Sequence, residues 1–310
     1  MVRISLLRVC STLRISYLAI EMNSRRSIIA TLFLITILNG GCLDIFSSGG
    51  GSYVKIHYVA IDIDDVFLSP NSPVDVKMNA GDVMRLLELT NKIGSSFGSD
   101  FKFSLGYNYG YFDITNPGDL ALIEHAGDFV WFDHLPRHEH VKENSLSTEK
   151  IENLMAESAK FEKSKGISPH VSKTYMITPK NEGTWPPYEP LYESFNKFGI
   201  LYTANSNIKS TYEYEGVRVF PRTLMGIGSS KQSAEEVSRG KILSLARWLY
   251  YELMINDITL IGAHQANFTD NRPAEKIFEE LIPMLLANKN HKFIFLPAEK
   301  AIEAYLNSQE

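Results

Sequence analysis

Residues 53–310 alternate between patterns typical of strands and patterns typical of helices, and this alternation restricts the possible folds more than any other feature. Short apolar or aromatic runs predict strands at residues 54–63, 101–105, 129–132, 174–177, 200–202, 217–220, 258–263 and 292–296. Such alternation predicts a mostly parallel α/β barrel or an open sheet in a single domain. In these folds the chemistry gathers at the carboxyl ends of the strands.

Apolar residues at three- and four-residue spacing predict the helices. They indicate helices at residues 81–93 and 150–165, the second ending at Gly166. The longest helix is predicted at residues 233–254, behind a capping box at its start. A last helix is predicted from Pro273, with an interruption near Pro283.

The first 42 residues form a targeting pattern. Arg25 and Arg26 precede an apolar run at residues 28–38, which small residues and Cys42 follow. In a helix this run spans about 16 Å, well short of a hydrocarbon core about 30 Å thick. The end of the run resembles a bacterial or archaeal lipobox, so we expect a lipid on Cys42. The alternative is an uncleaved anchor that ends in an incidental cysteine.

These features predict three parts of the chain. Residues 1–42 are a leader whose true start is expected at Met22, residues 43–52 are a flexible Ser/Gly tether, and residues 53–310 are the single folded domain. The expected location is outside the cytoplasm, at the cell surface or in the periplasm. Cys10 and Cys42 are the only cysteines, so the domain has neither a disulfide framework nor a cysteine zinc site.

The charge balance argues against one class of partner. The formal net charge is -5, with 31 Lys and Arg against 36 Asp and Glu. Proteins that follow nucleic-acid phosphates usually have a basic excess, so we expect no nucleic-acid partner. The same balance disfavours a strongly polyanionic substrate.

Three carboxylates close the first predicted strand, at Asp62, Asp64 and Asp65. Carboxylates crowded behind a buried strand repel one another unless a cation or a catalytic role compensates them. The alternative is a solvated loop followed by a helix cap.

His134 and His138 follow the predicted strand at residues 129–132. If Pro136 lies in a first helical turn, the two imidazoles point to one side, as a metal-binding pair must. Together with one aspartate they leave a zinc-like ion an open position for water. His140 is a spare histidine, either behind the pair or exposed. His264 ends a late strand and suits a general acid, although a lone histidine is more often structural.

Aromatic residues gather at 106–112 and 183–188, among glycines and prolines typical of loops. Flat aromatic rings pack well against the C–H faces of sugars. The alternative is that these rings simply plug the mouth of a barrel.

In this order the motifs resemble the polysaccharide deacetylase (NodB-like) superfamily, and most closely the N-deacetylase domain of heparan sulfate N-deacetylase/N-sulfotransferase. The run Asp64-Asp-Val-Phe67 is similar to that family's Asp-Asp-Ile-Phe. Trp131-Phe-Asp-His134 with His138 is similar to its Trp-Phe-Pro-His-x3-His. His264 with Asn267, Asp270 and Arg272 is similar to its Thr-His-x2-Asn-x3-Asp-Arg. Lys180 and Asn181 stand where the family has two histidines, so finer substrate contacts are expected to differ.

The resemblance implies a distorted (β/α) barrel and a metal-dependent hydrolase that removes N-acetyl groups from an N-acetylhexosamine polysaccharide or oligosaccharide. It implies Asp65, His134 and His138 as ligands of a divalent metal, most simply zinc. It also implies Asp64 as general base and His264 as general acid, although the two aspartates could exchange roles. The implied substrate contacts are Tyr107, Trp185, Arg222 and Asn267, with Arg222 either binding substrate or orienting Asp64. The membrane is expected as a partner through the lipid anchor only.

Two rival functions stay open at this point. Asp62 and Asp64 also fit the Asp-x-Asp pattern of a haloacid-dehalogenase-type phosphatase, with Asp62 as nucleophile and magnesium as cofactor. That function leaves His134, His138 and His264 without a role. The other rival is a catalytically idle glycan-binding surface lipoprotein, which would keep the aromatic residues and lose metal ligands.

Overall fold

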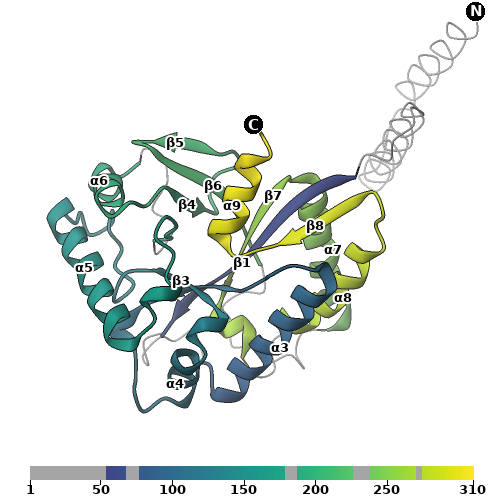
Figure 1. Ribbon diagram of the computed structural model, residues 1–310, viewed down its shortest axis with the longest axis horizontal. Coiled ribbons are helices and arrows are strands. Elements are labelled where there is room, and N and C mark those ends of the chain that lie inside the picture. Colours follow the sequence, from purple (N-terminus) through teal and green to yellow (C-terminus); the bar gives the residue numbers. More distant parts are fainter. Residues whose placement is uncertain (1–53, 68–76, 179–186, 226–237, 270–273) are drawn as a thin grey trace, which may run out of the picture. The chain divides into compact units, whose positions relative to one another are not determined.

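The computed structural model describes residues 54–67, 77–178, 187–225, 238–269 and 274–310, and the strands in these ranges form one sheet (Figure 1). The strand order is β3-β2-β1-β7-β6-β4, with β5 beside β6 and β8 beside β1. The strands are β1 (Lys55–Val66), β2 (Ser104–Tyr107), β3 (Val130–Asp133), β4 (Tyr202–Asn205), β5 (Tyr212–Tyr214), β6 (Val217–Leu224), β7 (Ile258–His264) and β8 (His291–Phe295). All these pairs are parallel except β5 with β6. The predicted α/β class is confirmed.

Isolated bridges link the two edges of the sheet. Trp131 in β3 bridges Val171, and Tyr175 bridges Tyr202 in β4. The segment from Val171 to Tyr175 therefore stands between the edge strands, which makes the sheet a distorted barrel, as predicted. The predicted strand at residues 174–177 is wrong, since only the single bridge at Tyr175 forms there.

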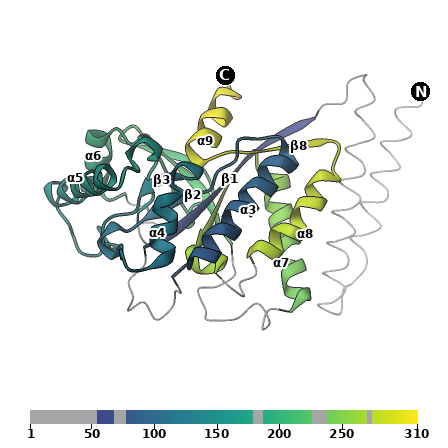
Figure 2. The ribbon, with the colours of Figure 1, turned by 60° about the horizontal axis from the view of Figure 1, so that its bottom comes forward.

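Helices cover both faces of the sheet, and the last of them contributes Ala298, Ala301 and Ile302 to the cluster that contains Ala60. They are α3 (Ala80–Phe97), α4 (Pro117–Glu124), α5 (Thr148–Lys165), α6 (Glu189–Phe198), α7 (Arg239–Ile255), α8 (Ala274–Leu286) and α9 (Ala298–Asn307). In Figure 2, α3, α7 and α8 stand beside β1 and β8, whereas α5 and α6 lie at the other side of the sheet. Alternate residues of β1 serve the two faces: Val59 and Ile61 pack in the core under the helices, and Ala60 packs in a second cluster. By the same alternation Asp62 lies on the face of Ala60.

Two predicted helices differ from the observed ones. The predicted capping box of the late helix lies outside the described residues, and α7 begins at Arg239 behind Ser238, whose side chain accepts a hydrogen bond from the Lys241 backbone N–H. At 17 residues α7 is shorter than α3 and α5, with 18 each, so it is not the longest of the described helices. Helix α8 continues through Pro283 without the predicted interruption. Pro283 is exposed, so water can satisfy the carbonyl that loses its helical donor.

Residues Val54–Glu310 form one compact unit. The leader, Cys42 and the Ser/Gly tether lie outside the described residues. Within the described part of the chain, no helix combines the length and the hydropathy needed to cross a bilayer.

Candidate active site

The ends of parallel strands bring the candidate residues to one edge of the sheet. Asp64 of β1 lies in register with His264 of β7. Tyr107 of β2 lies in register with Asp133 of β3, the residue before His134. Because these strands run in the same direction, side chains that are far apart in sequence meet at their carboxyl ends.

Irregular backbone at the end of β1 brings two consecutive carboxylates to this edge. The register between β1 and β2 shifts between Ile63 and Val66, and Asp65 has a left-handed φ of 59°. In a regular strand, consecutive side chains point to opposite faces, so this irregularity is needed for Asp64 and Asp65 to serve one site. Backbone strain in non-glycine residues is concentrated at functional sites.

The two oxygens of the Asp65 carboxylate face different imidazoles. Oδ1 lies 3.3 Å from Nε2 of His134 and 3.1 Å from Nε2 of His138, and Oδ2 lies 2.9 Å from Nδ1 of His264. Burial raises the pKa of Asp65, but the three facing imidazoles outweigh it and hold the pKa well below its usual range. Asp65, and not Asp64, is therefore the carboxylate that stands beside both candidate ligand histidines.

The donor set fits a divalent cation. One atom each from Asp65, His134 and His138 lies within 4.8 Å of the others. Oδ1 of Asp65 is buried and has no hydrogen-bond partner among the described residues. Nδ1 of His134 lies 2.7 Å from the carbonyl oxygen of Ile177, which only accepts, so Nδ1 donates; when the ring is neutral, as a metal ligand must be, its Nε2 lone pair faces Oδ1. Lone pairs on O and N that face each other repel unless a cation lies between them. One carboxylate with two imidazoles is a ligand set that suits zinc.

A turn, and not the expected helical turn, presents His134 and His138. No helix contains Pro136, and both Leu135 and His138 have left-handed φ values, 62° and 58°. The Asn108 side-chain amide donates to the carbonyl oxygens of His134 and Leu135, at 2.9 and 2.8 Å, and stabilises this backbone. The prediction that the imidazoles share one side holds, although its helical explanation was wrong.

Arg222 of β6 holds the Asp64 carboxylate in a two-point contact. Its guanidinium donates to both carboxylate oxygens, at 2.6 and 2.8 Å, and only 1% of its side chain is exposed. Gly262 of β7 makes room for it, since a Cβ there would lie 2.5 Å from Cζ of Arg222. Of the two roles considered for Arg222, the structure therefore favours orientation of Asp64 over substrate binding, because a buried side chain does not reach a substrate.

Asp62 is fully buried behind this ion pair. It accepts a 2.6 Å hydrogen bond from the Tyr175 hydroxyl, and Nε of Arg222 lies 3.6 Å from its carboxylate. Burial raises the pKa of Asp62 to about 7, and the Arg222 charge and Tyr175 hydrogen bond only partly offset it. Near neutral pH, Asp62 is therefore protonated part of the time, and Arg222 is balanced mainly by Asp64. Sequence reasoning missed Tyr175, because no motif links it to Asp62.

Two contacts orient His264, one to its ring and one to its backbone. Its Nδ1 contacts Asp65, and its backbone N–H donates to Oδ1 of Asn267 at 2.8 Å. Its side chain is 40% exposed, so the ring remains accessible to a substrate. Asn267 is only 3% exposed and stabilises the turn after β7, and its contact with substrate stays a prediction.

Tyr107, one of the two predicted sugar platforms, lies in the core of the fold, and its contact with a substrate stays a prediction. Its ring is fully buried, its hydroxyl donates to Glu162 at 2.6 Å, and it stacks on Phe161. This matches the alternative in which aromatic residues fill the barrel. Trp185, the other predicted platform, lies outside the described residues.

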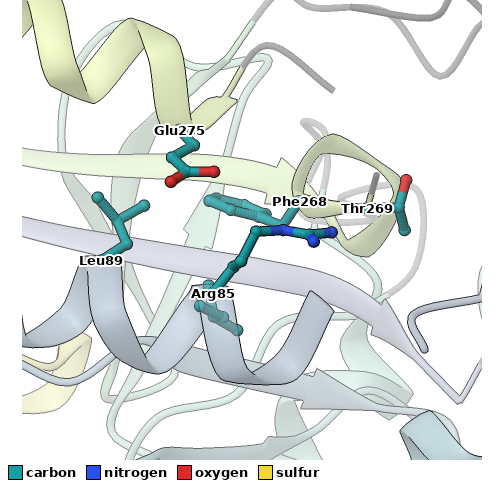
Figure 3. A pocket seen from close by; sticks show the side chains of 6 residues that line it. Arg85, Leu89, Phe268, Thr269 and Glu275 are labelled. Atoms are coloured by element: carbon teal, nitrogen blue, oxygen red, sulfur yellow. The ribbon is translucent and has the colours of Figure 1, made fainter. Parts of the chain in front are cut away.

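A hollow on the helical side of this edge is too small for a sugar. Figure 3 shows it between α3, α8 and the short helix η5 (Gln265–Phe268), with Arg85, Phe268 and Glu275 among its lining residues. Its volume of about 10 Å³ leaves room for roughly one water molecule. The converging side chains, and not this hollow, define the candidate site.

Residues 56–229, more than half of the chain, match the family described as heparan sulfate-N-deacetylase, deacetylase domain. The bifunctional heparan sulfate N-deacetylase/N-sulfotransferase 1 of Caenorhabditis briggsae is 29% identical over 245 residues, covering 74% of this chain and 28% of the relative. The human enzyme of the same name is 24% identical over 273 residues, covering 80% of this chain and 29% of the relative. The chain thus spans less than a third of the length of these curated relatives.

Solved structures with the same fold include other deacetylases. Agd3, described as a novel carbohydrate deacetylase, superposes with a TM-score of 0.64 at 13% identity, covering 83% of this chain and 54% of Agd3. A putative polysaccharide deacetylase from Mycobacterium smegmatis superposes with a TM-score of 0.57 at 14% identity, covering 84% and 93% of the two chains. At such low identity these likenesses establish the fold alone.

Proposed function

Because the chain belongs to the heparan sulfate N-deacetylase family, we propose that it hydrolyses the N-acetyl amide of N-acetylhexosamine units in a polysaccharide, with a divalent metal as cofactor. The observation that supports this most is the convergence of Asp65, His134 and His138 beside an Arg222-held Asp64 and an accessible His264. The six side chains come from β1, β6 and β7 and from the turn after β3, and structural packing alone does not require that combination.

Each residue has a role in the proposed reaction. Asp65, His134 and His138 would hold zinc, which when bound polarises an acetyl carbonyl and acidifies a water molecule. Asp64 takes the proton of the attacking water, and Arg222 keeps its carboxylate fixed in the required orientation. His264 donates a proton to the departing amine, with its ring oriented by Asp65.

The phosphatase rival is disfavoured by the position of its nucleophile. Asp62 is fully buried and bonded to the Tyr175 hydroxyl. A carboxylate in that position does not reach the phosphorus atom of a substrate. The idle glycan-binding rival is disfavoured because the candidate ligands and both candidate proton-transfer groups are present.

Release of acetate from a glycan panel tests the proposed activity. The panel contains chitin fragments, N-acetylheparosan and cell-wall glycan, and each is assayed with the wild-type chain before and after metal removal. We expect acetate release from at least one N-acetylated glycan, loss of release on chelation and recovery with zinc. The proposal would be refuted if the chain released no acetate but hydrolysed a phosphate ester at the same rate before and after chelation.

We propose further that the chain acts outside the cytoplasm, anchored by a lipid on Cys42. The support is the order of basic, apolar and small residues before Cys42, all outside the described residues. Mass spectrometry of the mature N-terminus tests it. A diacylglyceryl group on Cys42 is expected, and an intact leader in the membrane fraction would contradict it.

A further inference from the structure

His138 is the less constrained of the two candidate ligand imidazoles. The side chain of His134 is 3% exposed and bonded to a backbone carbonyl, so packing and a rigid acceptor fix its ring. The side chain of His138 is 34% exposed, and its backbone is left-handed. A ligand ring that is one-third exposed needs another partner to keep its orientation, because little packing restrains it.

A short chain of side chains supplies that partner. Nδ1 of His138 lies 3.2 Å from Nε2 of His140, and Nδ1 of His140 lies 2.9 Å from Oε2 of Glu143. The rings of His138 and His140 meet edge-on, with centroids 5.2 Å apart. Neither His140 nor Glu143 belongs to the three-residue candidate metal group.

The Glu143 carboxylate determines which nitrogen donates in each of these hydrogen bonds. The Glu143 carboxylate only accepts, so Nδ1 of His140 donates to it, and Nε2 of the neutral His140 ring becomes an acceptor. Nδ1 of His138 must then donate to His140, which leaves the Nε2 lone pair of His138 facing Oδ1 of Asp65 at 3.1 Å. Glu143 thereby selects the tautomer of His138 that binds a metal.

We propose that His140, oriented by Glu143, is a positioning residue that fixes the ring and tautomer of His138 as a metal ligand; this rests on the metal site of the proposed function. Partners of this kind on the remote nitrogen of a ligand histidine typically change metal affinity about 10–100-fold. The backbone secures the other side of the turn, where the Gly110 N–H donates to the Pro136 carbonyl at 2.7 Å. The two anchors therefore flank His138.

Zinc affinity of the full chain tests the proposal, measured by competition with a chromophoric chelator. His140→Ala should weaken zinc binding about 10–100-fold. His140→Gln should keep most of the affinity, because its amide oxygen can accept from His138 and its amide nitrogen can donate to Glu143. Glu143→Gln should cost less than tenfold, since its side chain is 60% exposed and solvent screens the interaction.

The matched control is His125→Ala. His125 also contacts a carboxylate three residues later, Asp128 at 3.2 Å, but it follows α4 and is not part of the metal group. Its removal should leave zinc affinity unchanged. Nitrogen-15 spectra of the zinc-loaded wild type should show Nδ1 protonated and Nε2 unprotonated in His140.

The possible outcomes are distinct. Equal zinc affinity in His140→Ala and wild type would overturn the proposal. A loss as large as that of His138→Ala, without recovery in His140→Gln, would make His140 a ligand and also overturn it. If the wild type binds no zinc, the proposed metal site fails and this inference with it. Weakening that is specific to His140 supports the inference even if no glycan in the panel is deacetylated.

Discussion

At the scale of single residues, the Asp65 carboxylate connects two parts of the site. Oδ1 faces the imidazoles of His134 and His138, whereas Oδ2 orients His264. A change at Asp65 should therefore affect both the proposed metal binding and the proposed proton donor. Asp64, one residue earlier, contacts Arg222, so the two neighbouring aspartates should respond differently to substitution.

The first prediction separates these roles. Asp64→Asn should leave zinc content near normal, because its partner is Arg222, while kcat falls by about 10²–10⁴, the usual contribution of a general base. His134→Ala should lose zinc together with activity. Metal analysis of the purified variants, beside acetate release, measures both effects. If Asp64→Asn emptied the site and Asp65→Asn did not, the assignments of the two aspartates would have to be exchanged.

At the scale of elements, β7 has to make room for β6. Gly262 of β7 lies against the guanidinium of Arg222 from β6, and the two strands are paired directly. Glycine is needed here for the space that a missing Cβ leaves, because its φ is not left-handed. The orientation of Asp64 therefore depends on a residue without a side chain in a third strand.

The second prediction follows from this close approach. Gly262→Ala should displace Arg222, lower kcat and destabilise the fold by about 1–3 kcal/mol, the usual effect of overpacking a core. The matched control is Gly240→Ala in the first turn of α7, where a Cβ meets only Ser238 Oγ at 3.9 Å. That change should stabilise the protein slightly, by up to about 1 kcal/mol. Thermal unfolding and acetate release of both variants are the measurements, and equal behaviour of the two would contradict the role of Gly262.

The sequence predicted the elements better than their contacts. Alternation predicted most strands, because a strand buried on both faces reads as an apolar run whatever its neighbours are. The strand predicted at residues 101–105 is observed at Ser104–Tyr107, so the apolar run marked the strand without fixing its bounds. Asp64, Asp65, His134 and His138 were recognisable as motifs. Tyr175 and Gly262 were not, since their roles depend on register between distant strands, which local patterns do not encode.

At the scale of the whole molecule, a second pair of neighbouring histidines, the buried His57 and the partly buried His291, lies at the end of the sheet opposite the candidate site. Nδ1 of His57 lies 2.8 Å from the Asn256 carbonyl oxygen, and its Nε2 lies 2.7 Å from Nδ1 of His291. Burial lowers the pKa of both histidines, and nearby Lys55 lowers both further. The folded state therefore resists protonation that the unfolded chain accepts.

The third prediction is loss of stability in mild acid. In the unfolded chain these histidines titrate near a pKa of about 6.5. Above that pH neither state is protonated, so the pair does not change stability; below it the unfolded state gains protons first, and stability falls until the lowered folded pKa is reached. The histidine pair should therefore lower the melting temperature of the metal-free protein between pH 7 and 5, whereas Asp62, whose folded pKa is raised to about 7, contributes the opposite slope. His291→Phe should reduce that slope; an unchanged slope would assign the acid lability to other groups.

Strand β1, which ends in Asp64 and Asp65, pairs with β2, β7 and β8. Asp64 and its register partner His264 are 200 residues apart in the chain. At a ribosomal rate of about 5–20 residues per second, β1 waits roughly 10–40 s for β7 to be synthesised. Until then an apolar strand has no permanent neighbour on that side. The first of the described strands to be synthesised is thus among the last to gain all its neighbours.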